Sequence, residues 1–285
     1  MNLTHIPDEH PHGQRREGAA ENPARADGVA FPPAAREVAA FHARGFLHVR
    51  GLFTPPEIAA LRQDILRLQD AGLLIDLLKD ADPDAGAARP ANLQLCPLSP
   101  HSALVAALRW HPRVLAVVRA LLGEPLMFLL DQVFIKPSGR GAGTDWHQDH
   151  AYFGGGDPLL GVGMWVPLQD ATHVNGTMKV VPGSHRQPVE HHRDPRSELL
   201  IRATVDPARA QVIEMQAGDA LFFGFNVLHA TQDNRSSEPR TAIALHFCHQ
   251  HYAPPAQWTL VGPLSGTAAV AGTAAWPRAL EAASP

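Results

Sequence analysis

Cysteine is scarce in this chain of 285 residues, which has only Cys96 and Cys248, far apart in the sequence. Two isolated cysteines cannot form a disulfide framework, so the class of small secreted domains held together by disulfides is excluded. The low count suits a reducing compartment, and we therefore predict a cytoplasmic protein.

Long apolar runs and excess positive charge are also missing. No stretch reaches the length of a membrane-spanning helix, and the N-terminus lacks the charged and apolar regions of a secretory signal. The formal net charge is −4, and no strongly basic segment stands out. We therefore expect neither a membrane nor a nucleic acid as partner, and either a monomer or a homodimer.

Composition divides the chain into three parts. Residues 1–30 are polar and rich in Pro, Gly, His and Arg, which is typical of a disordered arm. Residues 31–252 carry the periodic apolar patterns of a single large domain. Residues 253–285 are rich in Ala, Pro and Gly, and we expect this extension to pack on the surface or to be flexible.

Helical patterns occupy the first part of the domain. The sequence predicts a short helix at 35–43 that ends before Gly45, a strand at 46–50, and a helix that begins after Thr54, where Pro and Glu follow at favourable positions. A second clear helix ends at Gly123. Residues 72–100 between them are irregular and predict either a lid over a site or a surface loop.

From Leu126 onwards the apolar period changes to that of strands. Short apolar runs alternate with turn residues until about residue 250, which indicates a sandwich or barrel. The runs are 126–136, 162–168, 177–181, 212–215, 220–225 and 241–247. We predict a mainly β fold, an antiparallel double-stranded β-helix or cupin-like jelly roll, with the N-terminal helices packed on one sheet.

Histidine is abundant, with 17 residues, and one motif places it beside a carboxylate. His147 and Asp149 would point to the same side of an extended strand, with Gln148 turned away. Two histidines and one carboxylate form the open iron(II) site of non-haem oxygenases. The motif therefore predicts a metal site that needs a second, distant histidine.

His229 is the best placed of the candidate histidines because it follows a turn and a buried-looking strand. Farther along, Arg240 shares one face of a predicted strand with Ala242 and Ala244, while larger apolar residues occupy the other face. An arginine beside small residues leaves room for a pocket, and a buried arginine needs an anion such as a carboxylate.

Several motifs in this order resemble the phytanoyl-CoA dioxygenase (PhyH-like) family, a branch of the iron(II)/2-oxoglutarate-dependent oxygenases. The resemblance covers roughly residues 35–250. The motifs are Trp-His-Gln-Asp-His at 146–150, Trp-Val-Pro-Leu-Gln-Asp at 165–170, Asn-Gly-Thr-Met at 175–178, Val-Pro-Gly-Ser-His-Arg at 181–186, and Gly-Asp at 218–219 ahead of His229 and Arg240.

The resemblance implies a set of site residues. Iron(II) would be held by the catalytic ligands His147, Asp149 and His229, and Arg240 would bind the distal carboxylate of the cosubstrate 2-oxoglutarate. Three further positions resemble residues near that cosubstrate: Thr231, Lys136 and Trp165. Tyr152, Phe153 and Gln148 are candidates for contacts with the substrate because they adjoin the metal motif.

The implied activity is dioxygen-dependent hydroxylation of an unactivated C–H bond in a small-molecule metabolite, with succinate and carbon dioxide as co-products. Family halogenases replace the metal-binding carboxylate with a small residue, so Asp149 favours hydroxylation; desaturation, ring closure and epimerisation stay open. Two other classes also remain: a metal-dependent hydrolase or isomerase on a cupin-like barrel, and a non-catalytic ligand-binding jelly roll.

Overall fold

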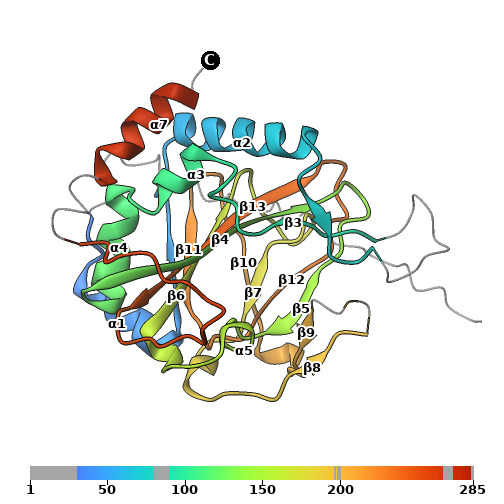
Figure 1. Ribbon diagram of the computed structural model, residues 1–285. Coiled ribbons are helices and arrows are strands. Elements are labelled where there is room, and N and C mark those ends of the chain that lie inside the picture. The colour runs from blue at the N-terminus through green and yellow to red at the C-terminus, as the bar shows by residue number, and fades with distance from the viewer. Residues whose placement is uncertain (1–30, 80–89, 196, 198–199, 266–271, 284–285) are drawn as a thin grey trace, which may run out of the picture.

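A computed structural model describes residues 31–79, 90–195, 197, 200–265 and 272–283 (Figure 1). The predicted disordered arm, residues 1–30, lies outside these described residues, as do residues 80–89 of the irregular segment.

Two antiparallel sheets form the body of the molecule. The larger sheet has, in spatial order, β1 (Phe46–Val49), β11 (Ala220–Gly224), β6 (Gly161–Pro167), β13 (Arg240–His249), β4 (Leu126–Lys136), β3 (Leu93–Leu95) and β2 (Ile75–Asp76). The smaller has β10 (Gln211–Ile213), β7 (Met178–Val180), β12 (His229–Thr231) and β5 (Thr144–His147). A separate pair is β8 (His192–Arg193) and β9 (Ile201–Arg202).

The main helices are α1 (Ala35–Arg44), α2 (Pro55–Asp70), α3 (Ala103–Leu108), α4 (Pro112–Leu122), α5 (His150–Phe153) and α7 (Ala275–Ala283), with short 3₁₀ turns η2 (Pro158–Leu160), η3 (Ser184–Arg186) and η4 (Pro207–Arg209). Helix α1 ends where predicted because Gly45 adopts a left-handed conformation, with φ of 88°. Helices α3 and α7 were not predicted from the sequence.

Alternation along the strands of the large sheet separates two cores. On β13, Ile243, Leu245 and Phe247 join the core beneath the helices, whereas Ala242 and Ala244 face the smaller sheet. Figure 1 shows α2, α3 and α7 gathered on the helical side. The jelly roll with helices on one sheet is therefore confirmed, and the space between the sheets contains small residues at the centre of β13.

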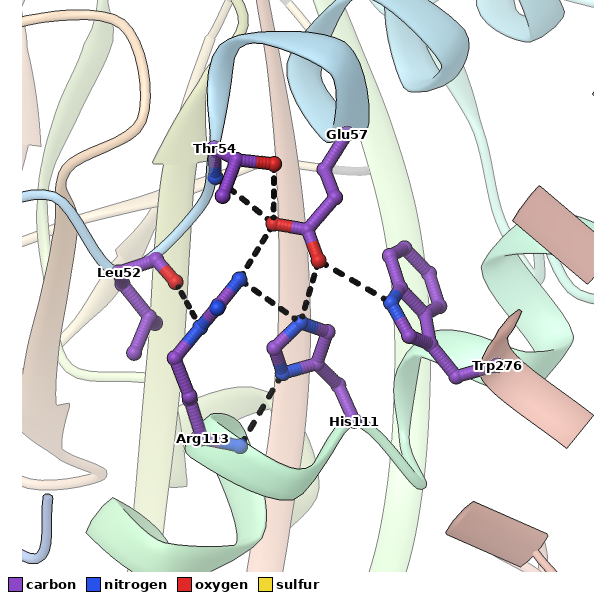
Figure 2. A network of polar contacts seen from close by, with 6 residues as sticks. All are labelled: Leu52, Thr54, Glu57, His111, Arg113 and Trp276. Atoms are coloured by element: carbon purple, nitrogen blue, oxygen red, sulfur yellow. Dashed lines mark hydrogen bonds and ion pairs between the residues drawn. The ribbon is translucent and has the colours of Figure 1, made fainter. Parts of the chain in front are cut away.

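A buried carboxylate connects the helices that cover this core (Figure 2). Glu57 at the start of α2 accepts hydrogen bonds from the backbone and hydroxyl of Thr54, from His111 Nε2 at 3.1 Å and from Trp276 Nε1 at 3.2 Å, and it pairs with Arg113. Burial alone would raise the pKa of Glu57, but these donors lower it to about 2. One side chain thus joins α2, α4 and α7.

Part of the irregular segment 72–100 lies in the fold rather than outside it. Strands β2 and β3 extend the large sheet beyond β4. Leu77 and Leu78, which follow β2, form a buried cluster with Ala142 and Leu200, and Phe134 of β4 packs against it. The described part of this segment therefore supports one side of the space between the sheets.

Candidate metal centre

His147, Asp149 and His229 come together between the two sheets, and all three are buried. His147 and His229 are cross-strand partners on β5 and β12, with ring centroids 4.2 Å apart. Asp149 Oδ1 lies 3.6 Å from the Nε2 atom of each histidine. These three atoms are close enough to bind one metal ion on the same side.

Backbone carbonyl groups orient both histidine rings. His147 Nδ1 lies 2.8 Å from the carbonyl oxygen of Asp145, and His229 Nδ1 lies 3.0 Å from that of Val227. A carbonyl can only accept, so each Nδ1 carries the proton and each Nε2 has a free lone pair. Both rings are therefore in the tautomer that binds a metal through Nε2.

The protonation states also suit metal binding, which requires neutral histidine and ionised carboxylate. Burial, followed by the nearby His229, lowers the pKa of His147 to about 3. Burial opposes ionisation of Asp149, but His229 and the hydrogen bond from His246 outweigh it and hold its pKa below the usual range. At neutral pH His147 is therefore neutral and Asp149 is ionised, so neither residue has to lose a proton before a metal ion binds.

Asp149 differs from the sequence prediction in its backbone. The extended strand ends at His147, and Asp149 is helical, with φ of −57° and ψ of −34°, at the start of α5. The strand ladder therefore positions the two histidines but not the carboxylate. The turn at Gln148 and side chains from elsewhere must fix Asp149 instead.

Gln148 points away from the metal, as predicted, and its hydrogen bonds connect the turn to neighbouring segments of the chain. Its side-chain amide donates to the carbonyls of Gln187 and Asn226, and its side-chain oxygen accepts from the backbone of Val189. Its backbone N–H donates to His191 Nε2 at 3.0 Å. Both amide donors are used, and Gln148 does not line the pocket that contains the triad.

Arg240 is buried at the other end of the same space, with 1% of its surface exposed. Its Nε and Nη1 atoms have no hydrogen-bond partner among the described residues, and its guanidinium lies 5.5 Å from the ring centroid of Trp165. Burial lowers the pKa of Arg240 to about 9, so it stays charged at neutral pH. An unpaired buried guanidinium fits a carboxylate that arrives with a ligand.

Lys136 lies directly opposite Arg240 on the adjacent strand β4 and is fully buried. Its Nζ donates to Thr231 Oγ1 at 2.7 Å and to the carbonyl of Gln232. Burial, together with the charge of Arg240, lowers the pKa of Lys136 well below its ordinary value. Two facing basic groups without a nearby buried acid strengthen the requirement for an anion.

One pocket includes both ends of this arrangement. The metal triad, Arg240 and Lys136 all line it. Its walls between these groups are mainly apolar and are formed by Phe134, Trp165, Met178 and Phe223. An elongated ligand could therefore contact the metal and the guanidinium together. The donor set at the metal and the unpaired Arg240 atoms together fit iron(II) with 2-oxoglutarate.

The remaining predicted substrate residues lie beside the triad. The ring of Tyr152 contacts that of His147 edge-on at 5.6 Å between centroids, and its hydroxyl accepts from the backbone of Ile201. Phe153 packs against Phe225 and Trp258 in a separate apolar cluster. Tyr152 adjoins the metal site directly, whereas Phe153 lies behind it.

Two histidines have larger roles than the sequence suggested. His246 lies 3.1 Å from Asp149 Oδ2. His191 accepts the Gln148 N–H described above. The only sequence signal for His246 is that it shares the Arg240 face of β13; for His191 there is none, because its partner is distant in the chain.

A jelly roll with a His-Asp-His triad and a buried basic anchor defines a non-haem iron, 2-oxoglutarate-dependent dioxygenase. The family model described as "Phytanoyl-CoA dioxygenase (PhyH)" matches residues 41–242, and the chain belongs to this family. The assignment decides against the hydrolase or isomerase that needs no cosubstrate and against the non-catalytic binding module.

Similar proteins and structures agree with the fold and the enzyme class. An ectoine dioxygenase of Nocardia farcinica is 29% identical over 233 residues, covering 74% of this chain and 76% of that protein. The crystal structure of EvdO2 from Micromonospora carbonacea var. aurantiaca, complexed with 2-oxoglutarate, is 27% identical with a TM-score of 0.61, over 78% of this chain and 92% of that one.

A third comparison concerns the fold alone. The epimerase SnoN, solved with Fe³⁺, alpha ketoglutarate and nogalamycin RO, has a TM-score of 0.63 at 23% identity, over 75% of this chain and 82% of that chain. Within the part of our chain that the structure describes, no helix combines the length and apolarity needed to cross a membrane.

Proposed function

We propose that this enzyme hydroxylates an unactivated C–H bond of a small-molecule metabolite, consuming dioxygen and 2-oxoglutarate and releasing succinate and carbon dioxide. The observation that carries the proposal is the pocket with an intact triad at one end and unpaired Arg240 donors at the other. When bound, iron and 2-oxoglutarate supply the oxidising chemistry. The chain positions the reactants and excludes water.

Each end of the pocket has a defined part in this proposal. His147, Asp149 and His229 hold the metal on one side and leave its other positions open. Arg240, whose Nε and Nη1 have no partner among the described residues, would bind the far carboxylate of 2-oxoglutarate, while Lys136 and Thr231 form the adjoining wall. Trp165 lies beside the guanidinium and shields it from water.

The pocket favours a small substrate or a small reacting end. Four apolar side chains form its walls between the metal triad and Arg240: Phe134, Trp165, Met178 and Phe223. Its apolar walls suit a hydrocarbon portion. A relative named ectoine dioxygenase takes its name from such a small compound. We therefore infer a small metabolite as the substrate, with Tyr152 at the approach to the metal.

The first test is an anaerobic visible spectrum. Metal-free protein receives iron(II) and then 2-oxoglutarate, and a weak charge-transfer band that requires both additions is expected. Asp149→Ala, which keeps both histidine ligands, should require more iron(II) before the band appears. Asp157→Ala, which removes an exposed carboxylate that caps a 3₁₀ turn, should retain it. Iron binding without a band in the unchanged protein would contradict the proposed cosubstrate.

The reaction type is tested by screening metabolites for substrate-dependent succinate release under ¹⁸O₂. Hydroxylation predicts a product heavier than the substrate by one labelled oxygen atom. A product of unchanged mass and altered configuration would instead show epimerisation, and a product lacking two hydrogens would show desaturation or ring closure. Either result would overturn hydroxylation while leaving the metal site intact.

A further inference from the structure

The two oxygens of Asp149 face different partners. Oδ1 points to the metal position, at 3.6 Å from Nε2 of both His147 and His229. Oδ2 instead lies 3.1 Å from Nε2 of His246. Because a carboxylate oxygen accepts, His246 Nε2 must carry the hydrogen and donate it to Oδ2.

His246 has this bond as its only hydrogen bond among the described residues. Its side chain is 1% exposed, and Nδ1 is buried without a partner. The rings of Phe153 and Phe225 lie beside it, at 5.1 and 6.0 Å between centroids. Burying an imidazole in such apolar surroundings is unfavourable unless its polar contacts compensate. The single contact that does so is the one to Asp149.

The need for such a contact follows from the backbone. Strand pairing fixes His147 against His229, but Asp149 lies beyond the end of β5 at the start of a four-residue helix. No ladder holds its carboxylate. His246 belongs to β13 of the opposite sheet, so it reaches Asp149 from a rigid element across the pocket.

We propose that His246 is a positioning residue that holds Asp149 as a one-oxygen metal ligand. With Oδ2 bound to His246, only Oδ1 is free for the metal. A carboxylate that turned both oxygens to the metal would occupy one more coordination position. The triad must leave three positions open for a two-point cosubstrate and dioxygen, so the bond from His246 protects the position that a second Asp149 oxygen would take.

Three variants separate this role from simple packing. His246→Leu removes the donor. His246→Gln keeps an N–H donor the same number of bonds from the backbone. His249→Leu, at the end of the same strand and bound to the carbonyl of Glu124, serves as the matched control. Thermal melting of each metal-free protein reports whether the fold is intact.

Two affinities are then measured under nitrogen: that for Co²⁺, by visible titration of metal-free protein, and that for 2-oxoglutarate, by the charge-transfer band at saturating iron(II). His246→Leu should bind Co²⁺ about 10–100-fold more weakly, the usual effect of removing a group that orients a metal ligand. It should also bind 2-oxoglutarate more weakly. His246→Gln should recover most of both affinities, and His249→Leu should match the unchanged protein.

The proposal is overturned if His246→Leu binds Co²⁺ and 2-oxoglutarate as tightly as the unchanged protein, or if His246→Gln is no better than His246→Leu with both folded. If His246→Leu does not fold, His246→Asn replaces it in the comparison with His246→Gln, because the amide of asparagine lies one bond closer to the backbone and does not reach Asp149. The inference rests on the metal site of the proposed function. If the unchanged protein bound Co²⁺ but gave no charge-transfer band with iron(II) and 2-oxoglutarate, the proposed function would be refuted. The Co²⁺ affinities of the His246 variants would then still decide whether His246 positions Asp149.

Discussion

At the scale of single residues, the unusual feature is a pair of buried basic groups with no buried acid beside them among the described residues; the acid that acts on Lys136, Asp233, is exposed. Arg240 and Lys136 face each other on β13 and β4, and two donors of Arg240 have no partner in the part of the chain that the structure describes. Such an arrangement lowers stability in the empty protein, because desolvation of a charge is not compensated. It is expected to become favourable once a carboxylate enters.

Replacing Arg240 with Met should therefore separate stability from binding. We expect the metal-free, cosubstrate-free variant to be more stable to urea than the unchanged protein by at least about 1 kcal/mol, since an unpaired buried charge is replaced by an apolar chain of similar length. In Co²⁺-saturated protein, 2-oxoglutarate at 100 times its dissociation constant should add about 2.7 kcal/mol of stability to the unchanged protein and hardly any to the variant. Arg235→Met, on the surface, should show neither effect. If 2-oxoglutarate stabilised Arg240→Met as much as the unchanged protein, Arg240 would not be the residue that binds its far carboxylate.

Gln148 gives a second prediction at this scale. Gln148→Glu keeps the shape but replaces two N–H donors with oxygens that face the carbonyls of Gln187 and Asn226. We expect a loss of about 1–3 kcal/mol in the free energy of unfolding, because two buried acceptors lose their donors. Gln187→Glu, with an exposed side chain, should change stability little in the same urea titration. Similar curves for the two variants would show that the amide does not fasten this turn.

At the scale of elements, the helices are joined through one carboxylate. Glu57 accepts donors from the start of its own helix, from α4 and from α7 (Figure 2). Its folded pKa of about 2 lies below the ordinary value of 4.5. A depressed carboxylate pKa contributes stability that is fully present above about pH 5 and is lost as pH falls towards 2.

Glu57→Gln should remove this acid-sensitive stability. At pH 7 we expect the variant to unfold at lower urea, by about 2–3 kcal/mol in free energy. The difference from the unchanged protein should shrink as the pH falls from 5 to 3, because the carboxylate takes up a proton in the unfolded chain while the folded one, with a pKa of about 2, stays ionised. Glu124→Gln, which removes a half-exposed pair with Arg119, is the control. A constant difference across this pH range would contradict the assigned titration.

The sequence predicted most elements for identifiable reasons. Strand β13 alternates small and large residues, so its two faces, including the position of Arg240, could be read in advance. The end of β5 could not, because His147-x-Asp149 looks extended and the turn depends on contacts from Gln148 to a distant loop. Helix α7 escaped detection because it lies in a stretch rich in Ala, Pro and Gly; Trp276 is buried against Glu57, and Ala279 and Leu280 pack against the same core.

At the scale of the whole molecule, the C-terminal helix closes the core beneath the large sheet. Trp276 is 4% exposed and packs edge-on to His111, with centroids 4.8 Å apart. Helix α7 contacts both α2 and α3. The pocket lies on the opposite face of the same sheet, so the two regions share a scaffold but no side chains.

Trp276→Ala should therefore affect stability far more than catalysis. We expect a loss of about 3–5 kcal/mol, the usual range for removing a buried tryptophan. The KM for 2-oxoglutarate, measured at a temperature where the variant is folded, should stay within a factor of two. Arg278→Ala, on the exposed side of the helix, should match the unchanged protein. A large rise in KM for the folded Trp276→Ala protein would reveal coupling between helix and pocket.

The placement of metal and guanidinium has one more consequence. On β12, His229 binds at the metal while Thr231, one side-chain repeat or roughly 7 Å along the strand, touches the lysine beside Arg240. A diacid that is bound at both ends is selected by the distance between its two binding groups. We expect the pocket to bind the five-carbon 2-oxoglutarate more tightly than oxaloacetate, which is one carbon shorter, and 2-oxoadipate, which is one carbon longer.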